Sequence, residues 1–368
     1  MNSQQEWPPA VLRVVWLTGG VVAVNEPAQA EVFMKSNIAG RTFATLTIAT
    51  YAEIFSALRS LGCRIVGTTF VTNAQQLEGL QALEFRAAGL SDGWPVWDGT
   101  QQWKQVAFAS SQKGQSRLMD VAARISAALR YSELRLHDLS NSYSRQLHSR
   151  VHAGQPEAYV RFKDTFSSTV YKDIHSIFWE MAVLRDVLAE FLTVFCLGRS
   201  DATTLSGLLR SLNKSSSADG FAEEIRRISD HESADGWLGR FGSYRDCFTH
   251  SAPLNLVAGS AFAIQDQLVL KDSSSVPQIY YPLPERPADL MRERAKGVAF
   301  DPTNGSDPTR RQKHDRTKEP DALEYLHGCL CQLTELAMRL IARSPVAPEP
   351  IALTRDEIIG EIKIVPTA

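Results

Sequence analysis

Arg245, Asp246 and His250 are the residues in this sequence whose types and spacing best suit catalysis. They lie at the centre of "GRFGSYRDCFTHSAPL", residues 239 to 254. A histidine with an ordinary pKa near ~6.5 can accept or donate a proton at neutral pH, and an arginine offers a permanently charged fork of donors to phosphate oxygens. On a helix, Asp246 and His250 are one turn apart, so the carboxylate can bond one ring nitrogen and keep the imidazole basic. These residue types therefore indicate acid–base chemistry beside an anion.

The spacing of an arginine and a histidine carries little weight by itself, because the chain contains three similar pairs. They are Arg226 with His231, Arg130 with His137, and Arg145 with His152. The arginine at 245 differs because a short acid follows it and because its helix lies between two strong apolar seams. A structural interpretation stays open, in which Arg245 and Asp246 pair within a helix and His250 is favoured at the helix C-terminus.

The remaining histidines and cysteines do not form a convincing metal or cofactor site. His148 and His152 are four residues apart, but the glutamate of the HExxH motif is missing, and a solvent-facing pair is favoured. Cys329 and Cys331 would point to nearly opposite sides of a helix, so we expect them to pack. The sequence contains no Gly-rich phosphate loop and no nucleophile elbow. We therefore expect no metal and no cofactor.

Hydrophobic periodicity predicts mainly helices around the motif. Apolar residues repeat at three- and four-residue steps over 177–195 and over 323–340, which is typical of helices packed in a bundle. Further helices are expected over 28–61, 116–151, 201–213, 219–231 and 235–250. Short strands are expected within 11–24 and in a hairpin formed by "QLVLK" and "VPQIYYPL". Residues 91–103 are predicted to be a turn-rich interruption, and residues 301–321 a flexible loop.

These elements predict a mainly α protein in three parts. Residues 1–155 form an N-terminal helical region with short strands and no assigned role, residues 156–345 form an up-and-down helical bundle, and residues 346–368 form a tail with a possible terminal strand. The net charge of the 368-residue chain is -2, so any nucleic-acid contact must come from a local patch. The N-terminus lacks the features of a signal peptide, charges interrupt the most apolar segment, and none of the five cysteines falls in a CxxC pair. We expect a cytoplasmic protein with reduced thiols and no membrane partner.

The motif and its flanking helices resemble the HEPN ("higher eukaryotes and prokaryotes nucleotide-binding") superfamily. The resemblance rests on "RDCFTH" and the helix order, and it covers about residues 158 to 345. In that family an arginine, a polar residue and a histidine four to six residues beyond the arginine lie on one helix of a bundle. Many members are metal-independent endoribonucleases in stress, toxin or antiviral settings. The resemblance implies that Arg245, His250 and Asp246 are catalytic, with the 2′-hydroxyl of RNA attacking the adjacent phosphate.

The resemblance also implies a homodimer. Five residues turn an α-helix by about 140°, so Arg245 and His250 diverge on one chain, and the family brings two motifs together in a shared cleft. Further candidates for RNA binding lie around the motif and in a basic loop: Tyr244, Arg240, Thr249, Arg310, Arg311 and Lys313. Tyr244 can stack on a base or pack, and packing is favoured. The loop can reach phosphates, although nearby acids dilute its charge.

Two other functions stay open. One is a non-catalytic helical module that binds RNA, a nucleotide or a protein. The other is a toxin of this family that is regulated by nucleotidylation of Tyr244, with a protein partner such as an antitoxin.

Overall fold

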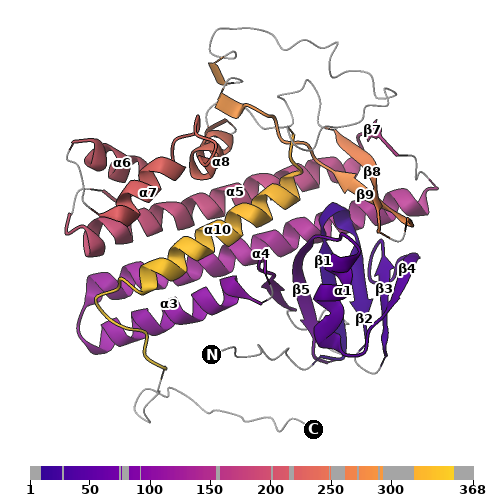
Figure 1. The fold of residues 1–368 in the computed structure, drawn as a ribbon, viewed down its shortest axis with the longest axis horizontal. Coiled ribbons are helices and arrows are strands. Elements are labelled where there is room, and N and C mark those ends of the chain that lie inside the picture. Colours follow the sequence, from indigo (N-terminus) through magenta and orange to yellow (C-terminus); the bar gives the residue numbers. More distant parts are fainter. Residues whose placement is uncertain are drawn as a thin grey trace.

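Long helices cross the molecule and a β-sheet packs against one end of them (Figure 1). The structure is a computed structural model that describes residues 10–26, 29–73, 76, 83–91, 93–154, 158–199, 202–214, 219–247, 249, 262–271, 273–288, 291–292 and 319–351. Helices α4 (Ser116–His152) and α5 (Thr165–Phe191) run antiparallel along the long axis. Helices α3 (Pro95–Gln112) and α10 (Ala322–Ile341) pack against this pair.

A six-stranded antiparallel sheet occupies the end of the molecule beside α4. Its strands are β1 (Leu12–Leu17), β2 (Val22–Asn25), β3 (Glu31–Lys35), β4 (Thr42–Thr47), β5 (Ile65–Val71) and β6 (Glu84–Ala87), in the order β4-β3-β2-β1-β5-β6. Strand β1 is buried along its whole length, as expected of a central strand, whereas edge strand β4 exposes its threonines. The short helix α1 (Ile54–Ser60) lies over this sheet (Figure 1).

The expectation of a mainly α, HEPN-like bundle is wrong, because the fold is mixed α/β. The error lies mostly in residues 28–61, which form β3, β4, a single 3₁₀ turn and α1 instead of one helix. Side chains of β3 alternate between buried and accessible, with Val32 and Met34 inside, which is the two-residue period of a strand. Strands β5 and β6 were not predicted at all. Among the described residues of the range 28–61, α-helix is confined to α1.

The second half of the chain follows the predicted elements more closely. Helices form at α6 (Leu205–Lys214), α7 (Gly220–Ile228) and α8 (Trp237–Asp246), and the expected hairpin is β8 (Ala263–Val269) with β9 (Ser275–Tyr280). A third strand, β7 (Val160–Phe162), joins that hairpin in the order β7-β8-β9. The prediction for 91–103 is wrong, since α3 begins at Pro95, where a proline is well suited to the first helical turn. Most of the predicted loop and all but the start of the predicted tail lie outside the described residues.

A buried polar network joins α4, α5, α10 and the end of β9. Asp321, which is 5% exposed, accepts hydrogen bonds from the Tyr281 amide (2.9 Å) and the Tyr143 hydroxyl (3.1 Å). The Tyr281 hydroxyl donates to Gln146 (2.6 Å), whose amide donates to Asp164 (2.7 Å). Asp321 and Asp164 also cap the N-termini of α10 and α5 by accepting backbone hydrogen bonds.

Among the described residues, no helix is both long enough and apolar enough to span a membrane.

We predict that Asp321→Ala lowers the free energy of unfolding by about 3 kcal/mol. The substitution removes a helix cap worth about 1 kcal/mol and leaves two buried donors without an acceptor. Chemical denaturation followed by circular dichroism measures the change. Gly328→Ala on the same helix is the matched control, because the added methyl group meets no atom within 4 Å. Alanine at position 328 should stabilise α10 by about 1 kcal/mol. An equal loss in the free energy of unfolding for both variants would contradict the role of Asp321.

Candidate functional site

Helix α8 carries the predicted motif and is fixed by its apolar face. Phe241 stacks on Phe178 of α5 with ring centroids 5.4 Å apart, and Tyr244 meets Tyr325 of α10 edge to face at 5.1 Å. Gly239 lets the helix pass close to the preceding turn, since a Cβ there would lie 2.4 Å from the Ser229 carbonyl oxygen. The helix therefore has one orientation relative to α5 and α10.

Arg245 and Asp246 form an ion pair at the C-terminal end of α8. The Nη1–Oδ1 distance is 2.9 Å, and the side chains are 21% and 42% exposed. The pair is therefore neither fully buried nor fully in solvent. Within the described residues, Arg245 Nε is buried without a hydrogen-bond partner. The carboxylate that was expected to bond His250 thus contacts the arginine, while His250 itself lies outside the described residues.

Helix α8 ends directly after this pair. Cys247 and Thr249 belong to a π-type turn, although Cys247 keeps α-helical φ and ψ of −55° and −49° and its amide still donates to the Ser243 carbonyl oxygen. Such turns are frequently found at functional sites, but the described chain contains a longer π-helical segment at Leu192–Cys196, directly after α5. Cys247 is fully buried, and Thr249 is half-buried with an Oγ1 that has no hydrogen-bond partner among the described residues. Sequence reasoning placed Thr249 near RNA but gave no sign of this change in helical geometry.

A cleft of about 580 Å³ opens beside α8, and Arg245 is not among its described lining residues. Arg240 and Ser243 line it from α8, and Arg286 and Arg292 line it from the segment after β9. The Arg240 guanidinium also donates to the carbonyl oxygens of residues 233 and 234, at 3.2 and 3.3 Å. Of the residues predicted to bind RNA, Arg240 is the one that borders this cleft. Sequence reasoning missed Arg286 and Arg292, which no motif distinguishes.

Tyr244 packs inside the protein, as the favoured interpretation expected. It is 3% exposed, and its hydroxyl donates to the Pro284 carbonyl oxygen at 2.6 Å. Burial raises its pKa above the ordinary value for tyrosine. The other predicted RNA contacts, Arg310, Arg311 and Lys313, lie outside the described residues.

The histidine and cysteine pairs considered as metal ligands have other surroundings. His148 Nδ1 lies 3.1 Å from the Ser36 hydroxyl, and its ring centroid is 6.3 Å from that of His152. Cys329 and Cys331 are both buried in α10 as free thiols. Within the part of the chain that the structure describes, no group of three or more His, Cys, Asp or Glu side chains is arranged to hold a metal ion.

Glu133 and His137 form a buried titratable cluster between α4 and the six-stranded sheet, which the sequence did not predict. Glu133 accepts hydrogen bonds from the Ala87 amide (2.8 Å) and from Arg130 (2.5 Å), and burial raises its pKa to about 7. One helical turn away, His137 lies between Trp16 and Phe85, and burial lowers its pKa to about 4. Sequence reasoning noticed Arg130 and His137 only as a pair with misleading spacing. Their burial depends on β1 and β6, which bring Trp16 and Phe85 to them.

Comparison with protein-family models, with curated proteins and with solved structures finds no match to this chain. The fold is mixed α/β, and it carries an Arg–Asp ion pair at the C-terminal end of α8.

We predict opposite pH effects of Glu133 and His137 on stability. The folded state favours protonated Glu133, so this residue lowers the free energy of unfolding as the pH rises from about 4.5 to 7. The folded state disfavours protonated His137, so this residue raises the free energy of unfolding as the pH rises from about 4 to 6.5. A pKa difference of one corresponds to about 1.4 kcal/mol, which makes each contribution about 3 kcal/mol. The two largely cancel in the wild-type protein.

Single substitutions should expose each effect in denaturation curves recorded at several pH values. Relative to His137→Phe, the wild-type protein should gain about 3 kcal/mol between pH 4 and 6.5. Relative to Glu133→Gln, it should lose a similar amount between about pH 4.5 and 7. Parallel pH profiles for all three proteins would show that neither side chain is buried as described.

Proposed function

We propose that this chain is a metal-independent endoribonuclease that acts as a homodimer, with Arg245, Asp246 and His250 in its active site. The observation that carries the proposal is the partly exposed Arg245–Asp246 ion pair at the C-terminal end of α8.

The proposed reaction is attack of an RNA 2′-hydroxyl on the adjacent phosphorus, with departure of the 5′-oxygen of the next nucleotide. His250 serves as the base that removes the 2′-proton or as the acid that protonates the leaving oxygen. Arg245 stabilises the negative charge that builds up on the phosphate oxygens. Asp246 holds the Arg245 guanidinium in place. A side chain that is fixed beforehand loses less conformational entropy when it binds a phosphate.

Two chains are required for a complete acid–base pair, because one histidine cannot serve as base and acid at the same time. A homodimer that brings two copies of His250 to one scissile phosphate provides both groups. The proposal includes the setting that the resemblance suggests, namely stress response, toxin action or antiviral defence. It also includes a protein partner that controls the enzyme.

Binding without cleavage is the second candidate function, and the cleft beside α8 favours it. Arg240, Arg286 and Arg292 border that cleft together with Glu232 and Glu285, and Arg245 is not among its described lining residues. A phosphate-bearing ligand could therefore be held by α8 without meeting the Arg245–Asp246 pair. Nucleotidylation of Tyr244 receives no such support, since its hydroxyl is buried and donates to Pro284.

We predict that the purified protein cuts single-stranded RNA in the presence of EDTA and leaves 2′,3′-cyclic phosphate ends. His250→Ala and Arg245→Ala should each reduce the rate by at least about 100-fold, the lower range for loss of an acid–base group or of a charge-stabilising donor. Asp246→Asn should reduce it less, because Arg245 keeps its charge. Gel assays and end-group analysis measure these effects.

Arg226→Ala is the matched control, because that arginine also precedes a histidine by five residues but is half-exposed and paired with Glu223. Its rate should equal that of the wild-type protein. Circular dichroism must show that each variant is folded. Folded wild-type protein with no cleavage at any concentration would refute the ribonuclease, and retained binding of RNA would then support the second candidate.

A further inference from the structure

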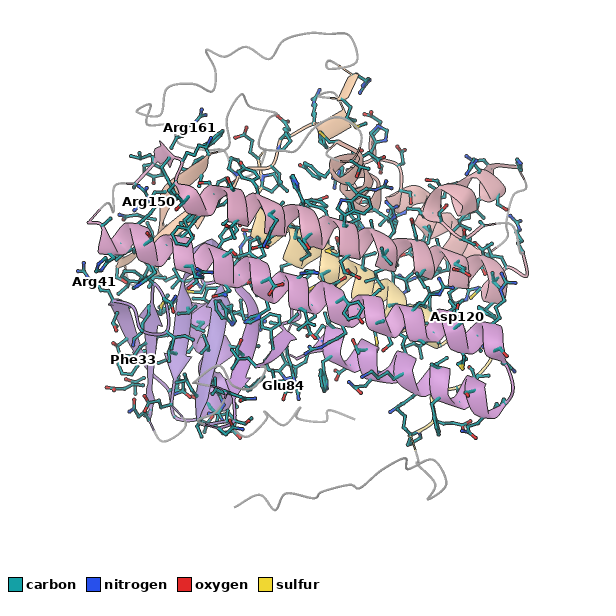
Figure 2. All side chains as sticks on the ribbon, turned by 180° about the vertical axis from the view of Figure 1, so that it is seen from behind. Phe33, Arg41, Glu84, Asp120, Arg150 and Arg161 are labelled. Carbon is teal, nitrogen blue, oxygen red and sulfur yellow. The ribbon has the colours of Figure 1, made fainter. Side chains whose placement is uncertain are left out.

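Basic side chains gather at the end of the molecule where α4 finishes and β7 begins. They come from the β3–β4 turn, from the last turns of α4 and from β7: Lys35, Arg41, Arg145, Arg150, Arg161 and Lys163. Figure 2 shows Arg41, Arg150 and Arg161 together at this end, with Asp120 at the opposite end. The Ser144 hydroxyl donates to the Ser36 carbonyl oxygen (2.9 Å), which fixes the turn against α4. We call these six residues the basic end.

Four cations of the basic end have no carboxylate partner in the part of the chain that the structure describes. Among the described residues, no ion pair involves Arg41, Arg145, Arg150 or Lys163, whereas the arginines of α7 pair with Glu223 and Asp235. Burial lowers the pKa of Arg150, and the charge of Asp164 opposes this effect. The Asp164 carboxylate already accepts hydrogen bonds from Gln146 and the Ser167 amide. In a chain of net charge -2, this is a local positive field.

Aromatic rings hold several of these arginines in place. The guanidinium carbon of Arg150 lies 3.6 Å from the ring centroid of Phe162, and that of Arg161 lies 4.6 Å from the centroid of Phe262. The Arg150 Nε also donates to Gln265 at 2.7 Å. Arginines ordered in this way lose less conformational freedom on binding phosphates than mobile side chains would.

An exposed tyrosine with an unusual backbone stands beside these cations. Tyr159 precedes β7, is 37% exposed and has a positive φ of 63°. Its amide donates to the Gln265 carbonyl oxygen at 2.7 Å, which holds the residue in this conformation. A bulky residue in the left-handed region costs about 1–3 kcal/mol, and such strain is concentrated at functional sites. Glycine would remove the cost, so the aromatic ring needs another explanation.

We propose that the basic end binds single-stranded RNA, with the exposed Arg41, Arg145 and Lys163 on consecutive phosphates and the Tyr159 ring stacked on a base. Positive side chains that follow a backbone, combined with an accessible aromatic ring, are the features by which proteins bind single strands. An acidic polypeptide or an anionic membrane would use the cations but not the ring. The inference deepens the proposed ribonuclease, on which it rests, by giving its substrate a docking surface apart from α8.

Fluorescence anisotropy with a labelled 2′-O-methyl oligonucleotide tests the proposal, because this probe cannot be cut by the proposed reaction. Arg41→Ala, Arg145→Ala and Lys163→Ala combined should weaken binding at least about tenfold at moderate salt. The slope of log K against log salt should fall by about 0.7 for each phosphate that the variant no longer neutralises. Arg226→Ala combined with Arg227→Ala on α7 is the matched control and should bind like the wild-type protein.

Tyr159→Gly separates base stacking from simple attraction of charge. It should raise the melting temperature, because glycine relieves the positive φ, and yet weaken binding about fivefold or more, as expected when one base is no longer stacked. Polyglutamate and anionic vesicles serve as competitors. The proposal would be overturned if either variant bound the probe as tightly as the wild-type protein. It would also be overturned if polyglutamate or vesicles displaced the labelled probe as well as unlabelled RNA does.

The outcome is distinguishable from that of the proposed function. Wild-type protein that binds the uncleavable probe through the basic end but cuts no RNA would refute the ribonuclease and support this surface. The opposite result is that the three basic-end substitutions change neither RNA cleavage nor probe binding. That result would support the ribonuclease and refute this surface.

Discussion

The buried carboxylate of Asp321 is the constraint on which the arrangement of the long helices depends. A single side chain begins α10, accepts the backbone amide that follows β9 and accepts the hydroxyl of Tyr143 in the middle of α4. A buried carboxylate is tolerated only where donors surround it, so the three elements must meet at this point. Through Tyr281 and Gln146 the same network reaches the N-terminal cap of α5. Helices that are separated in sequence are thereby fixed in relative position by polar groups that cannot be left unpaired.

The position of the candidate site follows from this constraint. Tyr325 lies one turn into α10, and its ring supports Tyr244 of α8, while Phe178 of α5 supports Phe241. Because Asp321 and Asp164 set where α10 and α5 begin, they also set where α8 can pack. Arg245 and Asp246 project from the far end of a helix whose inner face is fully used for packing. Their partial exposure is therefore a consequence of the helix orientation and does not result from loose packing.

Local periodicity was sufficient to predict the helices that bury one continuous stripe, such as α4, α5 and α10. It predicted strands within residues 11–24, where β1 and β2 form, but it failed for the other four strands of the six-stranded sheet, because long-range pairing decides which of those segments become strands. Residues 42–47 form an edge strand with only partly buried apolar residues, so their pattern is weak. The missed helix α3 has a related cause, since Pro95 and Gly99 read as turn residues although proline suits the first turn and Gly99 packs against α4 and α10. In the site, the sequence indicated Arg245 and Asp246 as neighbours and left open whether the carboxylate bonds His250 or pairs with Arg245, because spacing does not specify side-chain geometry.

Charge is distributed differently at the two regions proposed to meet RNA, and the difference suits different tasks. At α8 the carboxylate of Asp246 neutralises Arg245, which weakens its long-range attraction but fixes its guanidinium. At the basic end Arg150 has an aromatic and an amide partner, which order it without cancelling its charge. Uncompensated charge attracts a polyanion from a distance and supplies most of the binding energy, whereas a paired and oriented arginine contributes where charge develops on a single phosphate. A chain that is almost neutral overall can in this way combine general affinity for a strand at one surface with selective action at another.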